Sequence, residues 1–550
     1  MRRERGLVTF LLTAACFFKT TRARPEGTTI RTSLPDDQPT LTAWLPDFIY
    51  TGGRFESGLA LVADHAGRIV QVTRDHERLA ARVVRLKGRA LLPGLFNAHS
   101  HAFQRVIRGR TERRSAAHDS FWTWREMMYA AATRLTPEDI YDASRMAFLE
   151  MAASGITAVG EFHYLHRAPD GARYADENEL AKQVVRAAAD VGIRIALLRV
   201  AYARAGWNKS PDARQARFIE PDPEAFLKQT ESLKSDLARV VPPNPEARKD
   251  LAAANAQSAP GAWVGVAPHS VRAVPLDYLR EVCAFAAAHA MPVHMHVAEQ
   301  PAEIIACTEE HGRAPIALLA DEGLLDERFT AVHAVHITPE DVRSLAVARA
   351  HVCACPTTER NLGDGILPAD LLLGAGVRIS LGTDSHTQID LLEDARELEY
   401  HLRLQKLERA VLAPEASAQI DAQTNAGTNA ETNAMRAPTS REPNGETNGL
   451  AALAARLFDC ATVNGAAAVG AHGGTLAAGL PADFFTIALD DPSIAGAGTD
   501  DLLPAVVFSL ARTAMRDVVV GGRRIVEDGH HPTQDEIIER FANLQRRLWR

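Results

Sequence analysis

Eight short apolar runs recur between residues 90 and 386 and alternate with amphipathic segments. The segments between the runs, such as LAKQVVRAAADVG, place apolar residues at helical spacing. Alternating strand and helix units predict a parallel sheet, and eight of them predict an α/β fold, a (β/α)8 barrel of the TIM type. Nearly every run ends in polar residues, at the strand ends where barrel enzymes carry their active sites. The runs cover residues 90–101, 156–165, 194–202, 263–270, 292–300, 329–336, 351–359 and 378–386.

Two β-rich pieces flank this pattern at opposite ends of the chain. Residues 43–76 contain short strand-like runs with glycine turns, and residues 482–528 contain a hairpin signature around Gly521-Gly522. Because chain ends often lie close together, the two pieces can form one small domain. The predicted organisation is a β-sandwich domain formed by 41–90 and 476–530, a barrel over 91–475 and a C-terminal helix over 531–550.

Two segments fall outside both patterns. Residues 1–40 form an N-terminal extension without periodicity, which predicts disorder, and its apolar run, Leu7–Phe18, is too short to span a bilayer. This run resembles the core of a signal peptide, but Thr21-Arg22-Ala23 is a marginal cleavage site, so an early start codon is the alternative. We expect a cytoplasmic rather than a secreted protein. Residues 413–449 repeat Thr-Asn-Ala units with almost no large apolar residue, which predicts a flexible insertion in the barrel segment.

The composition excludes several classes of protein. The hydrophobic fraction is 46%, and the 61 Lys and Arg residues against 69 Asp and Glu residues give a net charge of −8. These values are ordinary for globular proteins and exclude collagen-like, wholly disordered and multi-span membrane classes. A mildly acidic chain has no general attraction to nucleic acid or anionic lipid. The 6 cysteines include no CxxC pair, which argues against a disulfide scaffold, a thiol-redox site or a cysteine-based zinc site.

Histidines and carboxylates gather at the ends of four of the apolar runs. His99 and His101 close the first run, and residues two apart on a strand face the same way, so both imidazoles can reach one cation. One such HxH pattern is weak evidence, because about one is expected by chance among 20 histidines. Three imidazoles and one carboxylate from several strand ends together suit Zn²⁺ or Fe²⁺. The other runs add His294, His296 and Glu299, then His333, then Asp384.

Several motifs carry a resemblance to a known family. LPGLFNAHSH, HVAEQ, VHAVH and GTDSH resemble the metal-site motifs of the amidohydrolase superfamily, in its mononuclear deaminase branch. AHSHAFQR, FWTWREMMY, TAVGEFHYLH, PHSVRAV, HMHVAEQ and NLGDGILP are similar to motifs of the formimidoylglutamate deiminases, and FWTWRE and NLGDG are specific to that family. The resemblance covers roughly residues 41–529 without the insertion, and implies a metallo-hydrolase barrel. Binuclear relatives carry a bridging lysine at a strand end, and its absence from the eight runs favours one metal ion.

The resemblance implies hydrolysis of a small molecule, N-formimino-L-glutamate, to N-formyl-L-glutamate and ammonia in histidine degradation. It implies one divalent cation per subunit, Zn²⁺ or alternatively Fe²⁺, and a metal-bound hydroxide that attacks the formimino carbon. We expect a homodimer with no nucleic-acid or membrane partner. The implied metal ligands are His99, His101, His296 and Asp384. The implied catalytic residues are Glu299 as proton shuttle, His333 in contact with the water, and Asp384. The implied substrate-binding residues are Gln104, Arg125, Tyr164, His269 and Arg272.

Other interpretations of these residues remain open at this stage. Arg125 could lie on the surface of an aromatic-anchored helix, Arg272 could be a solvated loop charge, and Tyr164 could be a core residue. A deaminase of the same branch acting on a purine, pyrimidine or triazine predicts an aromatic pocket without paired arginines. A catalytically inactive barrel used for binding would have lost metal ligands, and here all the ligand types are present.

Overall fold

The computed structural model describes residues 41–79, 81–112, 121–210, 212–240, 261–414 and 445–550. The N-terminal extension and most of the insertion predicted over 413–449 therefore lie outside the described residues. Within these ranges, no helix has the length and apolar character needed to cross a membrane.

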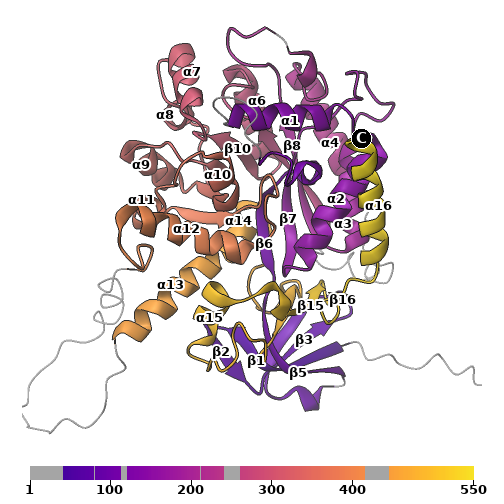
Figure 1. Cartoon of the computed structure of the whole chain (residues 1–550), viewed down its shortest axis with the longest axis vertical. Coiled ribbons are helices and arrows are strands. Elements are labelled where there is room, and N and C mark those ends of the chain that lie inside the picture. Colours follow the sequence, from indigo (N-terminus) through magenta and orange to yellow (C-terminus); the bar gives the residue numbers. More distant parts are fainter. Residues whose placement is uncertain (1–40, 80, 113–120, 211, 241–260, 415–444) are drawn as a thin grey trace, which may run out of the picture. The chain divides into compact units, whose positions relative to one another are not determined.

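Eight parallel strands form the centre of the fold, and Figure 1 shows the helices arranged around them. The strands are hydrogen-bonded in chain order, and β7 is buried along its whole length. This arrangement confirms the predicted (β/α)8 barrel. The barrel strands are β6 (Leu95–Ser100), β7 (Ile156–His163), β8 (Arg194–Ala201), β9 (Ala262–Pro268), β10 (Val293–Val297), β11 (Phe329–His333), β12 (His351–Ala354) and β13 (Arg378–Leu381).

The first and last strands close the barrel through a short, irregular seam. The only strand pairing between β6 and the β13 end in the described residues is an isolated parallel bridge between Ser100 and Asp384. Side chains reinforce it, because Asn97 Nδ2 donates to Thr383 Oγ1 at 2.7 Å and Thr383 N donates to Asn97 Oδ1 at 3.1 Å. The seam therefore brings the two ends of the barrel segment together at the residues predicted to bind metal.

Two helices of the barrel segment begin at residues whose chemistry favours a helix start. Thr136 and Asp139 form a capping box before α2, as do Thr338 and Asp341 before α9, and a proline occupies the first turn of each helix. The helices of the barrel segment are α1 (Phe121–Ala132), α2 (Pro137–Ala152), α3 (Glu179–Val191), α4 (Pro223–Val240), α6 (Leu276–Ala288), α7 (Pro301–His311), α8 (Pro315–Asp321), α9 (Pro339–Ala348), α10 (Pro356–Leu362), α11 (Ala369–Gly374), α12 (Leu391–Lys406), α13 (Gly445–Ala461) and α14 (Val463–Ala468).

The two ends of the described chain build the small β domain, as predicted. Hydrogen bonds join its strands in one continuous sheet in the order β16-β15-β14-β5-β1-β3-β4, with β2 paired to β1. This sheet has its own core, in which the Trp44 and Phe484 rings meet edge to face at 5.3 Å. Its strands are β1 (Leu41–Thr51), β2 (Arg54–Ser57), β3 (Ala60–Asp64), β4 (Ile69–Thr73), β5 (Ala81–Pro93), β14 (Phe484–Ala488), β15 (Met515–Val520) and β16 (Arg523–Val526).

Two further helices lie near the C-terminus, α15 (Leu502–Ser509) and α16 (Gln534–Leu548). Figure 1 shows α16 alongside α2, where Arg540 Nε donates to Asp142 Oδ1 at 2.7 Å and Arg145 donates to both carboxylate oxygens of Glu536. The end of the chain is thus held against the barrel wall by paired charges.

Stability at acidic pH should depend on His351, which begins β12 and is 2% exposed. Burial, followed by the charges of Arg378 and His294, lowers its pKa to about 3. Below pH 6.5, the His351 imidazole therefore binds a proton in the unfolded state but not in the folded state. The free energy of unfolding then falls as the pH drops from 6.5 towards 3. Between pH 6.5 and 4.5, wild type should lose about 2 kcal/mol more unfolding free energy than His351→Leu, measured by chemical denaturation.

The matched control for this experiment is His472→Gln, because His472 is an exposed histidine. The unfolding free energy of His472→Gln should depend on pH in the same way as that of wild type. Equal slopes for wild type and His351→Leu would show that His351 does not contribute to the acid sensitivity.

Candidate active site

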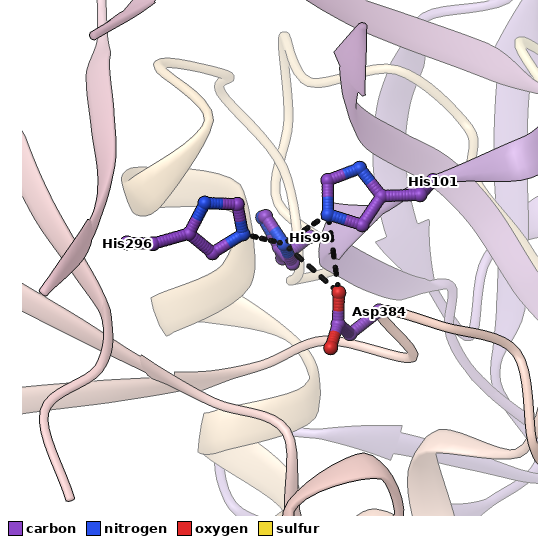
Figure 2. Close-up of side chains that lie close together, drawn as sticks. All are labelled: His99, His101, His296 and Asp384. Atoms are coloured by element: carbon purple, nitrogen blue, oxygen red, sulfur yellow. Dashed lines mark hydrogen bonds and ion pairs between the residues drawn. The ribbon is translucent and has the colours of Figure 1, made fainter. Parts of the chain in front are cut away.

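Three histidines and one aspartate converge at the carboxyl ends of the barrel strands, as Figure 2 shows. His99 Nε2 lies 3.2 Å from His101 Nε2, 3.2 Å from His296 Nε2 and 3.3 Å from Asp384 Oδ1, and His101 Nε2 lies 3.2 Å from the same oxygen. His99 and His101 come from β6 and its end, His296 from β10, and Asp384 from the loop after β13. The residues predicted as metal ligands are therefore brought together in one group.

The hydrogen bonds of these rings fit a bound cation. His101 Nδ1 lies 2.9 Å from the carbonyl oxygen of Phe162, and His296 Nδ1 lies 3.3 Å from that of His269. A carbonyl only accepts, so each Nδ1 carries the proton and each Nε2 directs a lone pair into the group. Lone pairs facing one another repel unless a cation lies between them. Ligands about 2.0–2.1 Å from one ion at tetrahedral angles are about 3.3 Å apart, which matches the distances here.

Burial puts these groups in the protonation states that a metal requires. Burial lowers the pKa of His99 to about 3 and holds the pKa of His296 well below its ordinary value. Burial would raise the pKa of Asp384, but hydrogen bonds with His101 and His99 outweigh it and keep the pKa well below its ordinary value. At neutral pH the site thus offers the unprotonated imidazoles of His99 and His296 and an ionised carboxylate.

The backbone around Asp384 explains why the motif GTDSH has its glycine. A Cβ on Gly382 would lie 2.7 Å from the His99 Cβ and 3.0 Å from the His99 carbonyl oxygen. Only glycine allows the end of β13 to approach β6 this closely. Asp384 itself has φ of 41°, and this left-handed conformation places its backbone in hydrogen bonds with both His99 and His101.

Glu299 and His333 lie beside the metal-ligand group. His333 Nε2 is 3.6 Å from Glu299 Oε1, and the His333 ring stacks on the His296 ring at 5.5 Å. Burial raises the pKa of Glu299, with His333 acting in the opposite direction. Burial alone would lower the pKa of His333, but Glu299, Glu359 and Asp384 raise it well above its ordinary value. This pair can therefore hold and exchange a proton next to the candidate metal site.

A cavity opens in front of these groups. It is lined by His101, His296, Glu299, His333 and Asp384 together with the five residues predicted to bind substrate, Gln104, Arg125, Tyr164, His269 and Arg272. His99 is fully buried and is not among the residues that line the cavity.

Neutral polar groups cover one wall of this cavity. Gln104, in the 3-10 helix Ala102–Ile107, donates from Nε2 to the Tyr164 hydroxyl at 2.8 Å, and both residues are buried. Burial raises the pKa of Tyr164 well above its ordinary value, so the phenol stays neutral. Burial also lowers the pKa of His269 well below its ordinary value, with the charge of Arg272 acting in the same direction.

Two guanidinium groups provide the positive charge of the cavity. Arg125, on α1, lies over the Tyr129 ring with its central carbon 5.3 Å from the ring centre. Arg272 follows β9 in the loop before α6. One pocket thus combines a candidate metal site, a carboxyl group with a raised pKa and two arginines.

The profile of the amidohydrolase family matches residues 90–525 of the chain. The chain belongs to the amidohydrolase family. The family is metal-dependent, and the group of three histidines and one aspartate could hold the ion.

Similar amidohydrolases include formimidoylglutamate deiminase of Pseudomonas aeruginosa, which is 36% identical over 459 residues, 83% of this chain and 89% of the relative. A 5-methylthioadenosine/S-adenosylhomocysteine deaminase of Pyrococcus abyssi is 25% identical over 87% of this chain and 92% of the relative. Among solved structures, an amidohydrolase from Brucella melitensis is 31% identical to this chain, with a TM-score of 0.76. The superposition covers 92% of this chain and 100% of the Brucella chain.

In this amidohydrolase, a buried network that the sequence analysis did not single out supports the ligand strand. Ser100, between two of the candidate ligands, donates to Glu161 Oε2 at 2.5 Å and lies 3.1 Å from His386 Nε2. Ala102 N donates to Glu161 Oε1 at 2.7 Å, and burial raises the pKa of Glu161 to about 7. Glu161 and His386 both lie inside motifs that carried the family resemblance, which was the available signal.

Four further residues, which were not predicted from the sequence, belong to the cavity wall. Tyr129, Tyr202 and Phe218 line the cavity, and the His269 and Tyr202 rings meet at 4.6 Å. Glu303, on α7, also lines it and accepts from Glu299 N at 3.2 Å. Tyr129 ends the motif FWTWREMMY, whereas Tyr202, Phe218 and Glu303 come from segments without a family motif, so only the fold brings these three to the site.

Proposed function

We propose that this chain is a metal-dependent formimidoylglutamate deiminase, which hydrolyses N-formimino-L-glutamate to N-formyl-L-glutamate and ammonia. The observation that carries the proposal is the presence of Arg125 and Arg272 in the same cavity as the candidate metal site and Glu299. The similarity to a relative named formimidoylglutamate deiminase over most of both chains supports it.

In this proposal, His99, His101, His296 and Asp384 hold one divalent cation, Zn²⁺ or Fe²⁺. When bound, the cation supplies Lewis acidity that lowers the pKa of a water molecule towards neutrality. The fixed Nδ1 contacts of His101 and His296 keep the two Nε2 atoms aimed at the ion.

Glu299 and His333 handle the protons of the reaction. Water adds to the electrophilic formimino carbon, the bond from that carbon to the imino nitrogen breaks, and the nitrogen leaves as ammonia. The nitrogen must gain the two protons that the water gives up. Glu299 lines the cavity and has a raised pKa, which suits a group that carries a proton at neutral pH. His333 lies beside Glu299 and Asp384 lines the same cavity, and both can orient the proton that leaves the water.

The substrate is a dicarboxylate, and the cavity contains the matching charges. Each guanidinium can bind a carboxylate through two parallel hydrogen bonds. Gln104, Tyr164 and His269 add neutral hydrogen-bonding groups, since burial keeps the Tyr164 phenol protonated and the His269 ring uncharged. A purine or pyrimidine has no pair of carboxylates that the two arginines of the cavity could bind.

The direct test is ammonia release by the purified, metal-loaded protein. N-formimino-L-glutamate should be the preferred substrate, and 5-methylthioadenosine, guanine and cytosine should be turned over poorly. Ammonia release from one of these ring compounds, without release from N-formimino-L-glutamate, would contradict this proposal. It would favour a deaminase that acts on a purine, pyrimidine or triazine. The homodimer and the cytoplasmic location stay predictions.

Replacing either cavity arginine with methionine should weaken kcat/KM without changing the metal content. Arg125→Met and Arg272→Met each remove one partner of a charge pair in a partly desolvated pocket, which should cost about 2–5 kcal/mol in kcat/KM. Arg→Lys should restore only part of this, since an ammonium cannot reproduce the two-pronged contact. Steady-state kinetics with N-formimino-L-glutamate and with analogues lacking one carboxylate measure both effects.

Arg214→Met is the matched control for Arg125. The Arg214 guanidinium also lies 5.3 Å from the Tyr129 ring centre, but it does not line the cavity and it pairs with Asp212 and Glu126. Its substitution should leave kcat/KM close to wild type. Wild-type efficiency in both Arg125→Met and Arg272→Met would show that these arginines do not bind the substrate.

A further inference from the structure

Glu359 is a buried carboxylate behind the active site that the proposed mechanism does not use. It lies on α10, is 2% exposed and is not among the residues that line the cavity. Its Oε1 lies 3.3 Å from His333 Nδ1, while the other ring nitrogen, His333 Nε2, lies 3.6 Å from Glu299 Oε1. The imidazole is therefore held between two carboxylates, one on each nitrogen.

The local backbone holds Glu359 in place. Cys355 N donates to the same oxygen, Glu359 Oε1, at 2.9 Å, and Glu359 N donates to the Cys355 carbonyl oxygen at 2.9 Å. Pro356 occupies the first turn of α10 and removes a competing backbone donor there. These contacts at the start of α10 hold the Glu359 carboxylate in place independently of its contact with the His333 imidazole.

We propose that Glu359 is a positioning residue for the hydrolytic reaction and acts through His333. Its oxygen accepts the hydrogen bond from His333 Nδ1–H, which fixes the plane of the ring and aims Nε2 at Glu299 and the cavity. His333 needs such support because its own backbone is irregular, with φ of 73°, and its ring is 1% exposed. This inference rests on the role given to His333 in the proposed function.

A second cation at His333, Cys355 and Glu359 is the competing explanation, since one ligand atom from each lies within 4.8 Å of the others. Two features favour the positioning role. The Glu359 oxygen that faces His333 already accepts a backbone hydrogen bond, and burial raises the pKa of the Cys355 thiol well above its ordinary value, which disfavours a thiolate ligand. Two metal equivalents in wild type and one in Glu359→Leu would overturn the positioning role.

The test compares three substitutions at Glu359 in the metal-loaded full chain. Glu359→Leu, which removes the acceptor, should lower kcat about 10–100-fold, with KM and the single metal equivalent close to wild type. Glu359→Gln keeps an acceptor oxygen at the same reach and should retain at least about a tenth of kcat. Glu359→Asp keeps the charge but withdraws the oxygen, so it should be as slow as the leucine variant. If Glu359→Leu does not fold, the test rests on whether kcat is higher in Glu359→Gln than in Glu359→Asp.

Glu399 provides the matched control. It is a fully buried glutamate on α12 that accepts from the backbone nitrogens of Val411 and Leu412, and it does not line the cavity. Glu399→Gln should leave kcat and KM unchanged. Wild-type kcat in Glu359→Leu, aspartate faster than glutamine at Glu359, or an equal fall of kcat in Glu399→Gln would each overturn the inference.

A measurement without substrate separates this inference from the proposed function. In protein labelled with [¹⁵N]histidine, the His333 signal, identified by its loss in His333→Asn, should shift in Glu359→Leu and stay in place in Glu399→Gln. An unchanged His333 signal in Glu359→Leu would overturn the positioning role, whatever the substrate. A shifted signal in a protein that does not release ammonia from N-formimino-L-glutamate would refute the proposed function and leave the contact between Glu359 and His333 intact.

Discussion

Replacing His99 with alanine should abolish metal binding and ammonia release together. His99 Nε2 is the atom common to most of the close contacts, 3.2–3.3 Å from His101, His296 and Asp384. The ring is fully buried, so no other side chain can swing in from solvent to replace it. Loss of one of four ligands leaves an incomplete coordination shell, and activity should fall to background. Elemental analysis of the purified variant, together with the ammonia assay, measures both losses, and Asp384→Ala should behave in the same way.

His294→Gln is the control for removing a buried histidine from the barrel interior. His294 lies on β10, two residues before His296, and its Nε2 contacts the carbonyl oxygen of Ala468 at 2.8 Å rather than the ligand group. This variant should keep a full metal equivalent. A full equivalent in an inactive His99→Ala protein would show that His99 is not a ligand.

The barrel could be predicted from the sequence because its strands are buried on both faces. Every residue of β7 is buried, and most of the strand is apolar with Glu161 and His163 near its carboxyl end, so it stands out from the amphipathic helices around it. The first run, 90–101, shows where this signal fails. It divides at Gly94 into the end of β5 in the small sheet and β6 in the barrel, and both parts are apolar. A Cβ on Gly94 would lie 2.2 Å from Thr157 Oγ1, a close approach that only the fold reveals.

The candidate ligands could be predicted because each stands at a strand end inside a compact motif, and barrel geometry brings strand ends together. The residues that support these ligands could not be predicted in this way. Glu359 ends the run predicted over 351–359, but it lies on α10 rather than on the strand, is 2% exposed and contacts a histidine 26 positions away. Ser100 and Glu161 are 61 positions apart. A buried carboxylate is recognised by its partners, and partners distant in the chain leave no local pattern.

Replacing Glu299 with glutamine should leave the metal bound and slow turnover about 10²–10⁴-fold, the usual contribution of general acid–base catalysis. The amide has almost the same shape as the carboxyl group but cannot carry a proton between water and the departing nitrogen. Glu299 is outside the ligand group and lines the cavity, so its loss should not disturb the coordination shell. Single-turnover measurements of ammonia release, with metal content determined on the same sample, give the size of the effect.

The division of the loss between kcat and KM makes the Glu299 test specific. In the proposed function the arginines bind the substrate carboxylates, so Glu299→Gln should lower kcat with little change in KM, whereas Arg125→Met should mainly weaken kcat/KM. The same Glu399→Gln variant controls for neutralising a buried glutamate, because Glu399 is fully buried on α12 away from the cavity. Near-normal turnover in Glu299→Gln would mean that the proton travels by another route. His333, 3.6 Å from Glu299, would then be the first group to test.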